Sequence, residues 1–249
     1  MNIVAILQAR CSSTRLPNKV LKPLLGKPMI QHQIERLNRS KLINKLVVAT
    51  SVHLSDKPLI ELCDSLKLDC YAGDLENVLD RFYNAALKSK ADIVVRLTGD
   101  CPLIDPVIVD AVISKHLSEH CDYTSNIEPE TFPDGLDVEV FSFSALKDAW
   151  ENATLLSECE HVTPYIRKNT KFSKNAYISP VDYSHFRWTV DEPRDFDFVE
   201  KVYSILGAKE QYFDSQAVLR LLEKHPELAD INGQIQRNEG YLKSISKEK

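Results

Sequence analysis

The first half of the chain alternates short apolar runs with stretches in which apolar residues recur at helical spacing. The runs "NIVAILQA" (2–9) and "ADIVVRLTGD" (91–100) predict buried strands, because each is short, apolar and ends in polar residues. Between them, "ENVLDRFYNAALKSK" (76–90) places its apolar residues on one helical face. This alternation predicts an α/β fold with a mostly parallel sheet and crossover helices.

The remaining elements follow from the same two periodicities. In the first half we expect strands at 44–51 and 69–73 and helices at 28–40, 55–67 and 105–117, the last two capped by Ser55 and Asp105. In the second half we expect strands at 136–142, 175–180 and 185–191, and helices at 144–150, 158–169, 193–206 and 214–226. The helix at 158–169 should be interrupted near Pro164, and the polar tail from Gly233 could be a frayed helix.

Composition limits the class of protein. The 249 residues, 43% of them hydrophobic, suffice for a real core and predict a single domain over 1–249, with an insertion at about 121–185 that could form an arm or lid. A net charge of −5 argues against nucleic-acid binding, and no apolar run approaches the roughly 18 residues of a membrane span. With no basic, signal-like start and six cysteines without a CxxC pair, we expect a cytoplasmic protein with reduced thiols.

The loop after the first strand concentrates cations and hydroxyls. Loops at the carboxyl ends of parallel strands line the ligand crevice of such sheets, and their backbone N–H groups favour anions. Arginine and lysine bind phosphate oxygens, so the loop suits a polyphosphate. The GxGxxG and GxxxxGK[ST] patterns are absent, and a solvated basic loop is the alternative. The three cations and three hydroxyl residues of this loop are Arg10, Ser12, Ser13, Thr14, Arg15 and Lys19.

The order of residues is more specific. The segment "LQARCSSTRLPNKVLKPLLGKPMI" (7–30) resembles the opening motif of the cytidylyltransferases that activate acidic sugars, the CMP-KDO and acylneuraminate synthetases, and most closely the spore coat polysaccharide biosynthesis protein F branch. The resemblance implies a three-layer α/β/α, Rossmann-like fold of the nucleotide-diphospho-sugar transferase type. It also implies that the loop from Ala9 wraps the triphosphate of CTP, with Arg10 and Lys19 on phosphate oxygens. Asn18 replaces the usual glycine, and asparagine tolerates a positive φ.

Two aspartates are candidates for a magnesium site. Asp100 follows the apolar strand at 91–100, and Asp191 follows "FRWTV" before Glu192-Pro193. Mg²⁺ prefers one or two carboxylates together with phosphate oxygens. From spacing alone, Asp100 could cap a turn and Asp191 could cap a helix; the resemblance implies that both bind Mg²⁺. Asp195 and Asp197 form a DxD pattern, but residues i and i+2 of a helix do not face each other.

Further candidates are distributed along the chain. By resemblance Arg81 belongs to the nucleotide pocket, although spacing alone fits a solvated helix charge, and Arg96 interrupts an apolar strand and should face the site. On the acceptor side the resemblance implies roles for Asp137, Glu139 and His161, with Arg187 as a balancing cation. His116 and His120, four apart on a helix, could form a metal face, but no further ligands follow at a suitable spacing.

The resemblance implies a Mg²⁺-dependent cytidylyltransferase. A hydroxyl of a sugar, expected to be a 2-keto sugar acid or a related sugar, would attack the α-phosphorus of CTP and release pyrophosphate and a CMP-sugar for surface polysaccharide or glycan synthesis. A homodimer is expected, and neither nucleic acid nor membrane is expected as a partner. The alternatives are a glycosyltransferase that uses a nucleotide sugar and a non-catalytic nucleotide-binding protein.

Overall fold

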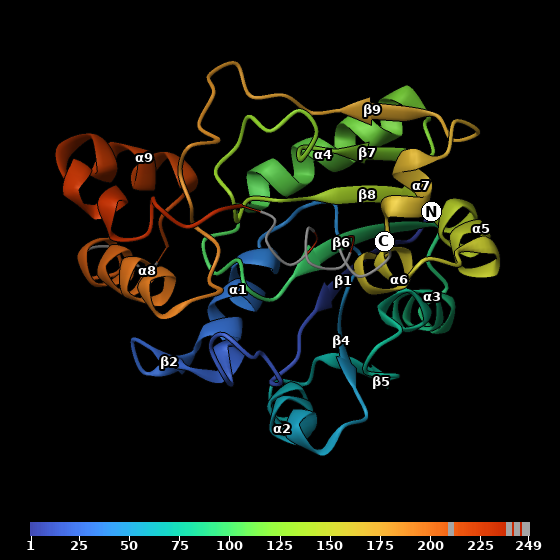
Figure 1. Ribbon diagram of the computed structural model, residues 1–249, viewed down its shortest axis with the longest axis horizontal. Helices are drawn as coiled ribbons and strands as arrows, with labels where there is room; N and C mark the ends of the chain where they lie inside the picture. Colours follow the sequence, from blue (N-terminus) through green and yellow to red (C-terminus); the bar gives the residue numbers. More distant parts are fainter. Residues whose placement is uncertain (209–211, 238–240, 242–244, 246–249) are drawn as a thin grey trace.

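A seven-stranded sheet forms the centre of the computed structural model, which describes residues 1–208, 212–237, 241 and 245 (Figure 1). The strand order is β5-β4-β1-β6-β8-β7-β9. Adjacent strands among β5, β4, β1 and β6 pair in parallel, whereas β8 is antiparallel to both of its neighbours. The strands are β1 (Ile3–Gln8), β4 (Lys45–Ser51), β5 (Asp69–Gly73), β6 (Ile93–Thr98), β7 (Tyr123–Ser125), β8 (Glu139–Ser142) and β9 (Lys174–Ala176). The expected α/β fold with a mostly parallel mixed sheet is confirmed.

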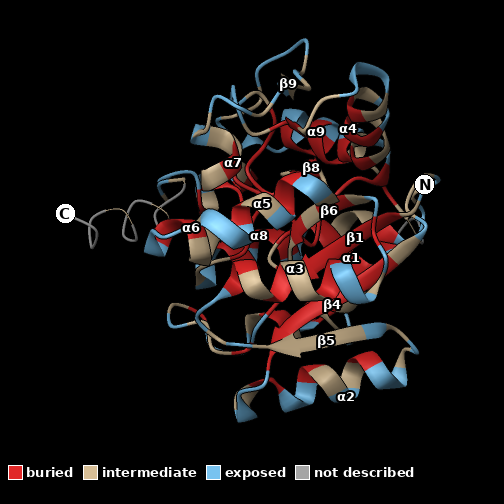
Figure 2. Ribbon diagram, turned by 90° about the vertical axis from the view of Figure 1, so that its right-hand side faces the viewer, coloured by how far each residue is buried: buried red, intermediate tan, exposed pale blue. Residues whose placement is uncertain are grey.

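Helices cover both faces because successive strand residues point to opposite sides. In β1, Ile3, Ala5 and Leu7 pack with the layer of α1 (Met29–Leu37), α2 (Lys57–Ser65) and α4 (Pro106–Glu119). Val4 and Ile6 pack with the opposite layer, built mainly from α3 (Val78–Lys88) and α5 (Phe143–Asn152). Figure 2 shows the buried central strands between helices whose outer sides are exposed. A sheet buried on both faces explains why its strands are apolar runs.

A further apolar core lies at the end of the sheet that carries α8 (Pro193–Leu206) and α9 (Ser215–Lys224) (Figure 1). Trp188 is fully buried there and packs with apolar residues of both helices. The core holds residues 186–192 through the packing of Trp188 and Val190. A backbone hydrogen bond also joins this segment to the loop after β6, since Val190 N–H donates to the carbonyl of Asp100 at 2.8 Å. A segment late in the chain is thereby held beside the loop that follows β6.

Strand order creates a switch point beside β1. The chain continues from β1 to β4 and β5 on one side of the sheet and then returns to β6 on the other side. After β1 and after β6 the chain therefore leads toward opposite edges of the sheet, and ligands bind beside such a point in open α/β sheets. Both loops carry residues singled out in the sequence.

Most of the expected elements are present, with local corrections. The expected strand at 185–191 is wrong: the segment pairs with loops, and only one isolated bridge, between Asp134 and Arg187, is formed. Ser55 does not cap α2; it lies in the short 3-10 helix η2 (Leu54–Asp56). The interruption near Pro164 is confirmed, since α6 (Leu156–His161) ends before α7 (Pro164–Lys168).

Other elements were missed or remain untested. The short strand β7 and the hairpin of β2 (Pro23–Leu24) and β3 (Lys27–Pro28) were not expected. Three strands of the 121–185 stretch extend the main sheet, and its role as an arm or lid stays a prediction. After α9 come the 3-10 helix η3 (Pro226–Ile231) and residues up to 237, and most of the expected helix in the tail lies outside the described residues. Among the described helices, none is long and apolar enough to cross a membrane.

Candidate active site

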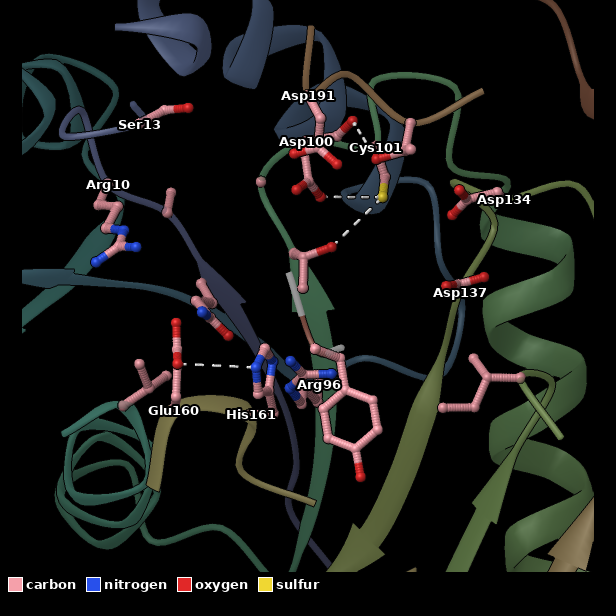
Figure 3. Close-up of a pocket in the computed structure, with 18 of the residues that line it drawn as sticks. Arg10, Ser13, Arg96, Asp100, Cys101, Asp134, Asp137, Glu160, His161 and Asp191 are labelled. Carbon is pink, nitrogen blue, oxygen red and sulfur yellow. Dashed lines mark hydrogen bonds and ion pairs between the residues drawn. The ribbon is translucent and has the colours of Figure 1, made fainter. Parts of the chain in front are cut away.

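A cavity of about 760 Å³ opens at the carboxyl ends of β1 and β6 (Figure 3). It brings together most of the residues singled out in the sequence, which come from five separate stretches of the chain. Ser12 and Arg81 are the exceptions, since they do not line it. The expected site residues that line the cavity are Ala9, Arg10, Ser13, Thr14, Arg15, Lys19, Arg96, Asp100, Asp137, Glu139, His161, Arg187 and Asp191.

The loop after β1 is folded back on itself and is held by a hydrogen bond to the buried Asp56. Asn18 has the left-handed conformation (φ 56°), and its N–H donates to the carbonyl of Cys11 at 3.0 Å. The N–H of Cys11 donates in turn to the buried carboxylate of Asp56 at 2.7 Å. Burial and the nearby Asp56 charge raise the pKa of Cys11 to about 11, so its thiol stays protonated and unreactive at neutral pH. Asparagine at position 18 therefore preserves the turn that glycine usually makes.

Gly99 allows the loops after β1 and β6 to touch. Its N–H donates to the carbonyl of Gln8 at 2.7 Å. A Cβ at position 99 would lie 2.8 Å from the Cβ of Ala9 and 3.1 Å from the Gln8 carbonyl oxygen. The absent side chain thus lets Asp100 stand directly beside the basic loop.

Asp100 and Asp191 meet around one ammonium group. The Nζ of Lys19 lies 3.1 Å from Asp100 Oδ2 and 2.8 Å from Asp191 Oδ1. It also donates to the carbonyl of Val190 at 2.9 Å. Burial works to raise the pKa of Asp100, but the charge of Lys19 and hydrogen bonds from Thr98, Lys19 and Cys101 outweigh it and bring the pKa to about 2. Both carboxylates are therefore held close together and Asp100 stays ionised at neutral pH.

Asp191 is bound by arginines on its other oxygen. Oδ2 lies 3.1 Å from Arg15 and 3.4 Å from Arg187. Arg187 is itself buried, with ion pairs at 2.9 Å to both Asp134 and Asp195. These ion pairs tie the 187–195 segment to the loop before β8, and the expected role of Arg187 beside the acceptor stays a prediction.

The two aspartates fit a divalent ion. A single cation already contacts one oxygen of each carboxylate within 3.1 Å, so the two oxygens converge on one point. Among the described residues, no group of three or more metal-ligating side chains is present. Two carboxylates with the remaining positions left to phosphate oxygens and water are the set that Mg²⁺ prefers. The DxD alternative is not supported, since Asp195 is buried and accepts from Arg187 and Asn232.

Arg10 lines the cavity on a different side from the two aspartates (Figure 3). Its side chain is exposed and makes no hydrogen bond or ion pair with the rest of the described chain. Arg81 is almost fully buried, and two of its guanidinium nitrogens lack a hydrogen-bond partner among the described residues. Burial and then the charge of Arg10 lower the pKa of Arg81. The two arginines therefore add positive potential at the same end of the cavity, although Arg81 lies behind its wall.

The opposite half of the cavity contains a buried network around Glu139. One Glu139 oxygen accepts hydrogen bonds from the hydroxyls of Tyr123 and Thr163, both at 2.6 Å. The other oxygen is paired with Arg96, the arginine that interrupts the apolar β6. Burial works to raise the pKa of Glu139, but Arg96, Arg167 and these hydrogen bonds lower it. The expected substrate contact at Glu139 is thus filled by protein groups, and the network supports the floor of the cavity.

Arg237 belongs to the cavity and was not singled out in the sequence. It contacts Asp137 at 2.8 Å and donates to the carbonyl of Phe132 at 3.3 Å. Burial and the neighbouring Asp137 charge raise the pKa of Asp134, on the same wall, to about 7. Arg237 lies in the polar tail, where no periodicity or motif marks it, so only the folded chain reveals this contact.

His161 lies at the lower rim of the cavity, next to Glu160 (Figure 3). Its ring packs edge-on against Tyr241, with 5.1 Å between the ring centroids. Burial and then the charge of Arg96 lower the pKa of His161 to about 4, so the ring is neutral at physiological pH. A neutral imidazole can both donate and accept hydrogen bonds, as a sugar hydroxyl requires.

The two histidines of α4 do not form a metal face. His116 is buried and its Nδ1 lies 3.1 Å from the hydroxyl of Thr124, whereas His120 ends the helix in the left-handed conformation and is exposed. The alternative of a zinc site is therefore not supported.

Comparisons with known proteins agree with this arrangement. A family model described as cytidylyltransferase matches residues 4–232. The spore coat polysaccharide biosynthesis protein SpsF of Bacillus subtilis is 30% identical over 241 residues, which cover 92% of this chain and 97% of SpsF.

Solved structures are also similar. A cytidylyltransferase from Leptospira borgpetersenii superposes with a TM-score of 0.89 at 30% identity, covering 95% of this chain and 100% of that chain. A CMP:2-keto-3-deoxy-manno-octonic acid synthetase complexed with CTP has a TM-score of 0.66 at 19% identity, covering 82% and 99%, which supports the fold. The family match and the near full-length likeness to SpsF place the chain: it belongs to the cytidylyltransferase family, in its SpsF-like branch.

Proposed function

We propose that this cytidylyltransferase transfers CMP from CTP to a hydroxyl of a sugar, with release of pyrophosphate. One observation carries the proposal: Arg10 and the basic loop after β1 line the same cavity as Asp100 and Asp191, at the switch point of the sheet. This places candidate phosphate-binding cations opposite a pair of carboxylates suited to a divalent ion. No other described part of the chain combines these features.

In this proposal each wall of the cavity has a separate task. Arg10, with the hydroxyls of Ser13 and Thr14, binds the β- and γ-phosphates, and the buried charge of Arg81 favours the anion from behind the wall. A Mg²⁺ ion bound by Asp100 and Asp191 would neutralise charge that develops on the transferring phosphoryl group. The protein contributes mainly alignment, because the acceptor hydroxyl must stand in line with the α-phosphorus and the leaving pyrophosphate.

The acceptor is proposed to bind on the wall formed by Asp137, His161 and the segments beside them. The neutral ring of His161 and the partly exposed Asp137 offer hydrogen-bond partners for sugar hydroxyls. The solved synthetase named for 2-keto-3-deoxy-manno-octonic acid supports a 2-keto sugar acid or a related sugar as the acceptor class. A homodimer and a cytoplasmic location complete the proposal.

A pyrophosphate-release assay tests the reaction. The enzyme is incubated with Mg²⁺, each of the four nucleoside triphosphates, and a panel of 2-keto sugar acids and neutral sugars; a parallel reaction contains nucleotide sugars in place of the triphosphates. Pyrophosphate release that requires both CTP and one sugar is the expected result. Release of a nucleoside mono- or diphosphate from a nucleotide sugar would instead indicate glycosyl transfer, and CTP binding without any turnover would indicate a non-catalytic protein.

A further inference from the structure

The ammonium group of Lys19 occupies the point between the two aspartates. Its three oxygen partners, on Asp100, Asp191 and Val190, lie between 2.8 and 3.1 Å away. An ammonium has three N–H donors, so this environment uses all of them. The side chain is only 11% exposed. In this state Lys19 therefore has no donor left for a phosphate.

The oxygens that Lys19 uses are the ones that a divalent ion would need. Lys19 contacts Oδ1 of Asp191, whereas Arg15 and Arg187 contact Oδ2. On Asp100, Lys19 contacts Oδ2, and the thiol of Cys101 donates to Oδ1. Departure of Lys19 would free one oxygen on each carboxylate, on the sides that face each other, while the other oxygens keep their partners. Two cations cannot share this point because like charges repel strongly at such distances.

A bound triphosphate would give the Lys19 side chain anionic partners other than the two carboxylates. It begins the short 3-10 helix η1 (Lys19–Leu21), directly after the loop that carries Arg10 and Ser13 on the cavity wall. A triphosphate on that wall would offer oxygens to the flexible lysine side chain. Without the triphosphate, withdrawal of Lys19 from the carboxylates would leave its charge without a partner in a mostly buried position, which is unfavourable.

We propose that Lys19 is an exchangeable internal counter-ion, which holds the divalent-cation position in the free enzyme and yields it when a nucleoside triphosphate binds. Free enzyme then binds a divalent ion weakly, and the nucleotide and the ion strengthen each other's binding. The coupling is reciprocal, since each ligand changes the affinity for the other by the same factor. The second part of this inference rests on the proposed function, because it requires a triphosphate site at Arg10.

Binding of Mn²⁺ to the nucleotide-free enzyme, measured by the EPR signal of unbound Mn²⁺, tests the first part without any catalysis. We expect Lys19→Met to bind one Mn²⁺ at least 10-fold more tightly than wild type. Lys27→Met is the matched control, because Lys27 pairs with Glu35 on an exposed surface and should leave Mn²⁺ affinity unchanged. The double variant Lys19→Met/Asp100→Asn should lose the gain. Equal affinities of wild type and Lys19→Met, or a gain that survives in the double variant, would overturn the proposal.

A second titration in saturating CTP, corrected for Mn²⁺ bound by CTP in solution, tests the coupling. Wild type should gain at least 10-fold in Mn²⁺ affinity when CTP is present, and Lys19→Met should gain much less. An equal gain in both proteins would refute Lys19 as the origin of the coupling. Calorimetry with CTP in the presence of Mn²⁺ distinguishes the two proposals. Absence of CTP binding under these conditions would count against the proposed function, while the nucleotide-free Mn²⁺ titration would still decide whether Lys19 blocks the metal position.

Discussion

The carboxylate of Asp56 accepts a hydrogen bond from the backbone N–H of Cys11 at 2.7 Å, across 45 positions of sequence. The same side chain accepts from the N–H of Ser51 at the end of β4, at 3.1 Å. One buried carboxylate therefore fixes the start of the basic loop to the neighbouring strand. The loop geometry depends on this residue, although Asp56 does not line the cavity.

Asp56→Ala should weaken both the fold and the nucleotide site. Loss of a buried acceptor leaves the N–H groups of Cys11 and Ser51 without partners, at a cost of about 3 kcal/mol in the free energy of unfolding. We expect CTP to bind about 10-fold more weakly, measured by calorimetry below the melting temperature. Asp64→Ala on the exposed side of α2 is the control. CTP affinity equal to that of wild type would show that the loop holds its shape without Asp56.

Asp100→Asn should preserve the fold and lower turnover at least 100-fold. The substitution keeps the shape of the side chain but removes one of the two charges that face Lys19 and that are proposed to bind the divalent ion. One well-placed transition-state interaction of this kind contributes about 3 kcal/mol. Circular dichroism and the pyrophosphate-release assay check the two parts of the prediction. A folded variant with full activity would contradict a role for Asp100 in binding the metal.

Gly99→Ala should disturb the junction of the two loops. The added methyl group would lie 2.8 Å from the Cβ of Ala9, so one loop must shift. Overpacking of this kind costs about 1–3 kcal/mol, and the melting temperature should fall accordingly. Because Asp100 follows directly, turnover should fall more than CTP affinity does. Gly233→Ala, which also meets a backbone atom but lies away from the cavity, is a suitable comparison.

His116 should make the protein sensitive to acid. Burial lowers its pKa from 6.5 to about 4, so between these values the unfolded chain binds a proton that the folded chain does not. The free energy of unfolding must therefore fall as the pH falls through this window, by about 2 kcal/mol at pH 5 relative to neutral pH. His116→Asn, which can keep the hydrogen bond of Nδ1 to Thr124, should lose about 2 kcal/mol less between pH 7.5 and pH 5. Urea unfolding at both pH values measures the difference, and identical losses would disprove the role of His116.

Local patterns predicted the elements that carry the site, because apolar runs and helix caps act over a few residues. Asp105 caps α4 as expected, with its carboxylate accepting from Val107 N–H at 2.9 Å. Segment 185–191 has the composition of a strand, but its partners are loops, so its pairing depends on tertiary contacts. The three residues of β7 are too few to show a period.

The candidate site was also predictable only in part, because some of its contacts depend on residues far apart in the sequence. The basic loop and Asp100 follow strands whose carboxyl ends share one sheet edge, so their approach could be anticipated. Asp191 follows a segment that forms no strand. The position of Lys19 between Asp100 and Asp191 could not, because it depends on side chains that are 81 and 172 positions away. Glu139 was likewise expected to contact the substrate, but in the structure its carboxylate oxygens bind Arg96, Tyr123 and Thr163.

The switch point beside β1 also separates the two walls of the cavity along the chain. The basic loop and Asp100 leave the early parallel strands, whereas Asp137, His161 and Arg237 come from the later stretches. Insertions or exchanges in those later stretches can therefore reshape the pocket for a different sugar, while the loops after β1 and β6 that are proposed to bind CTP keep their places. Enzymes with this arrangement can therefore evolve toward new sugar products through changes in the later part of the gene, while the part that encodes the early strands and loops stays the same.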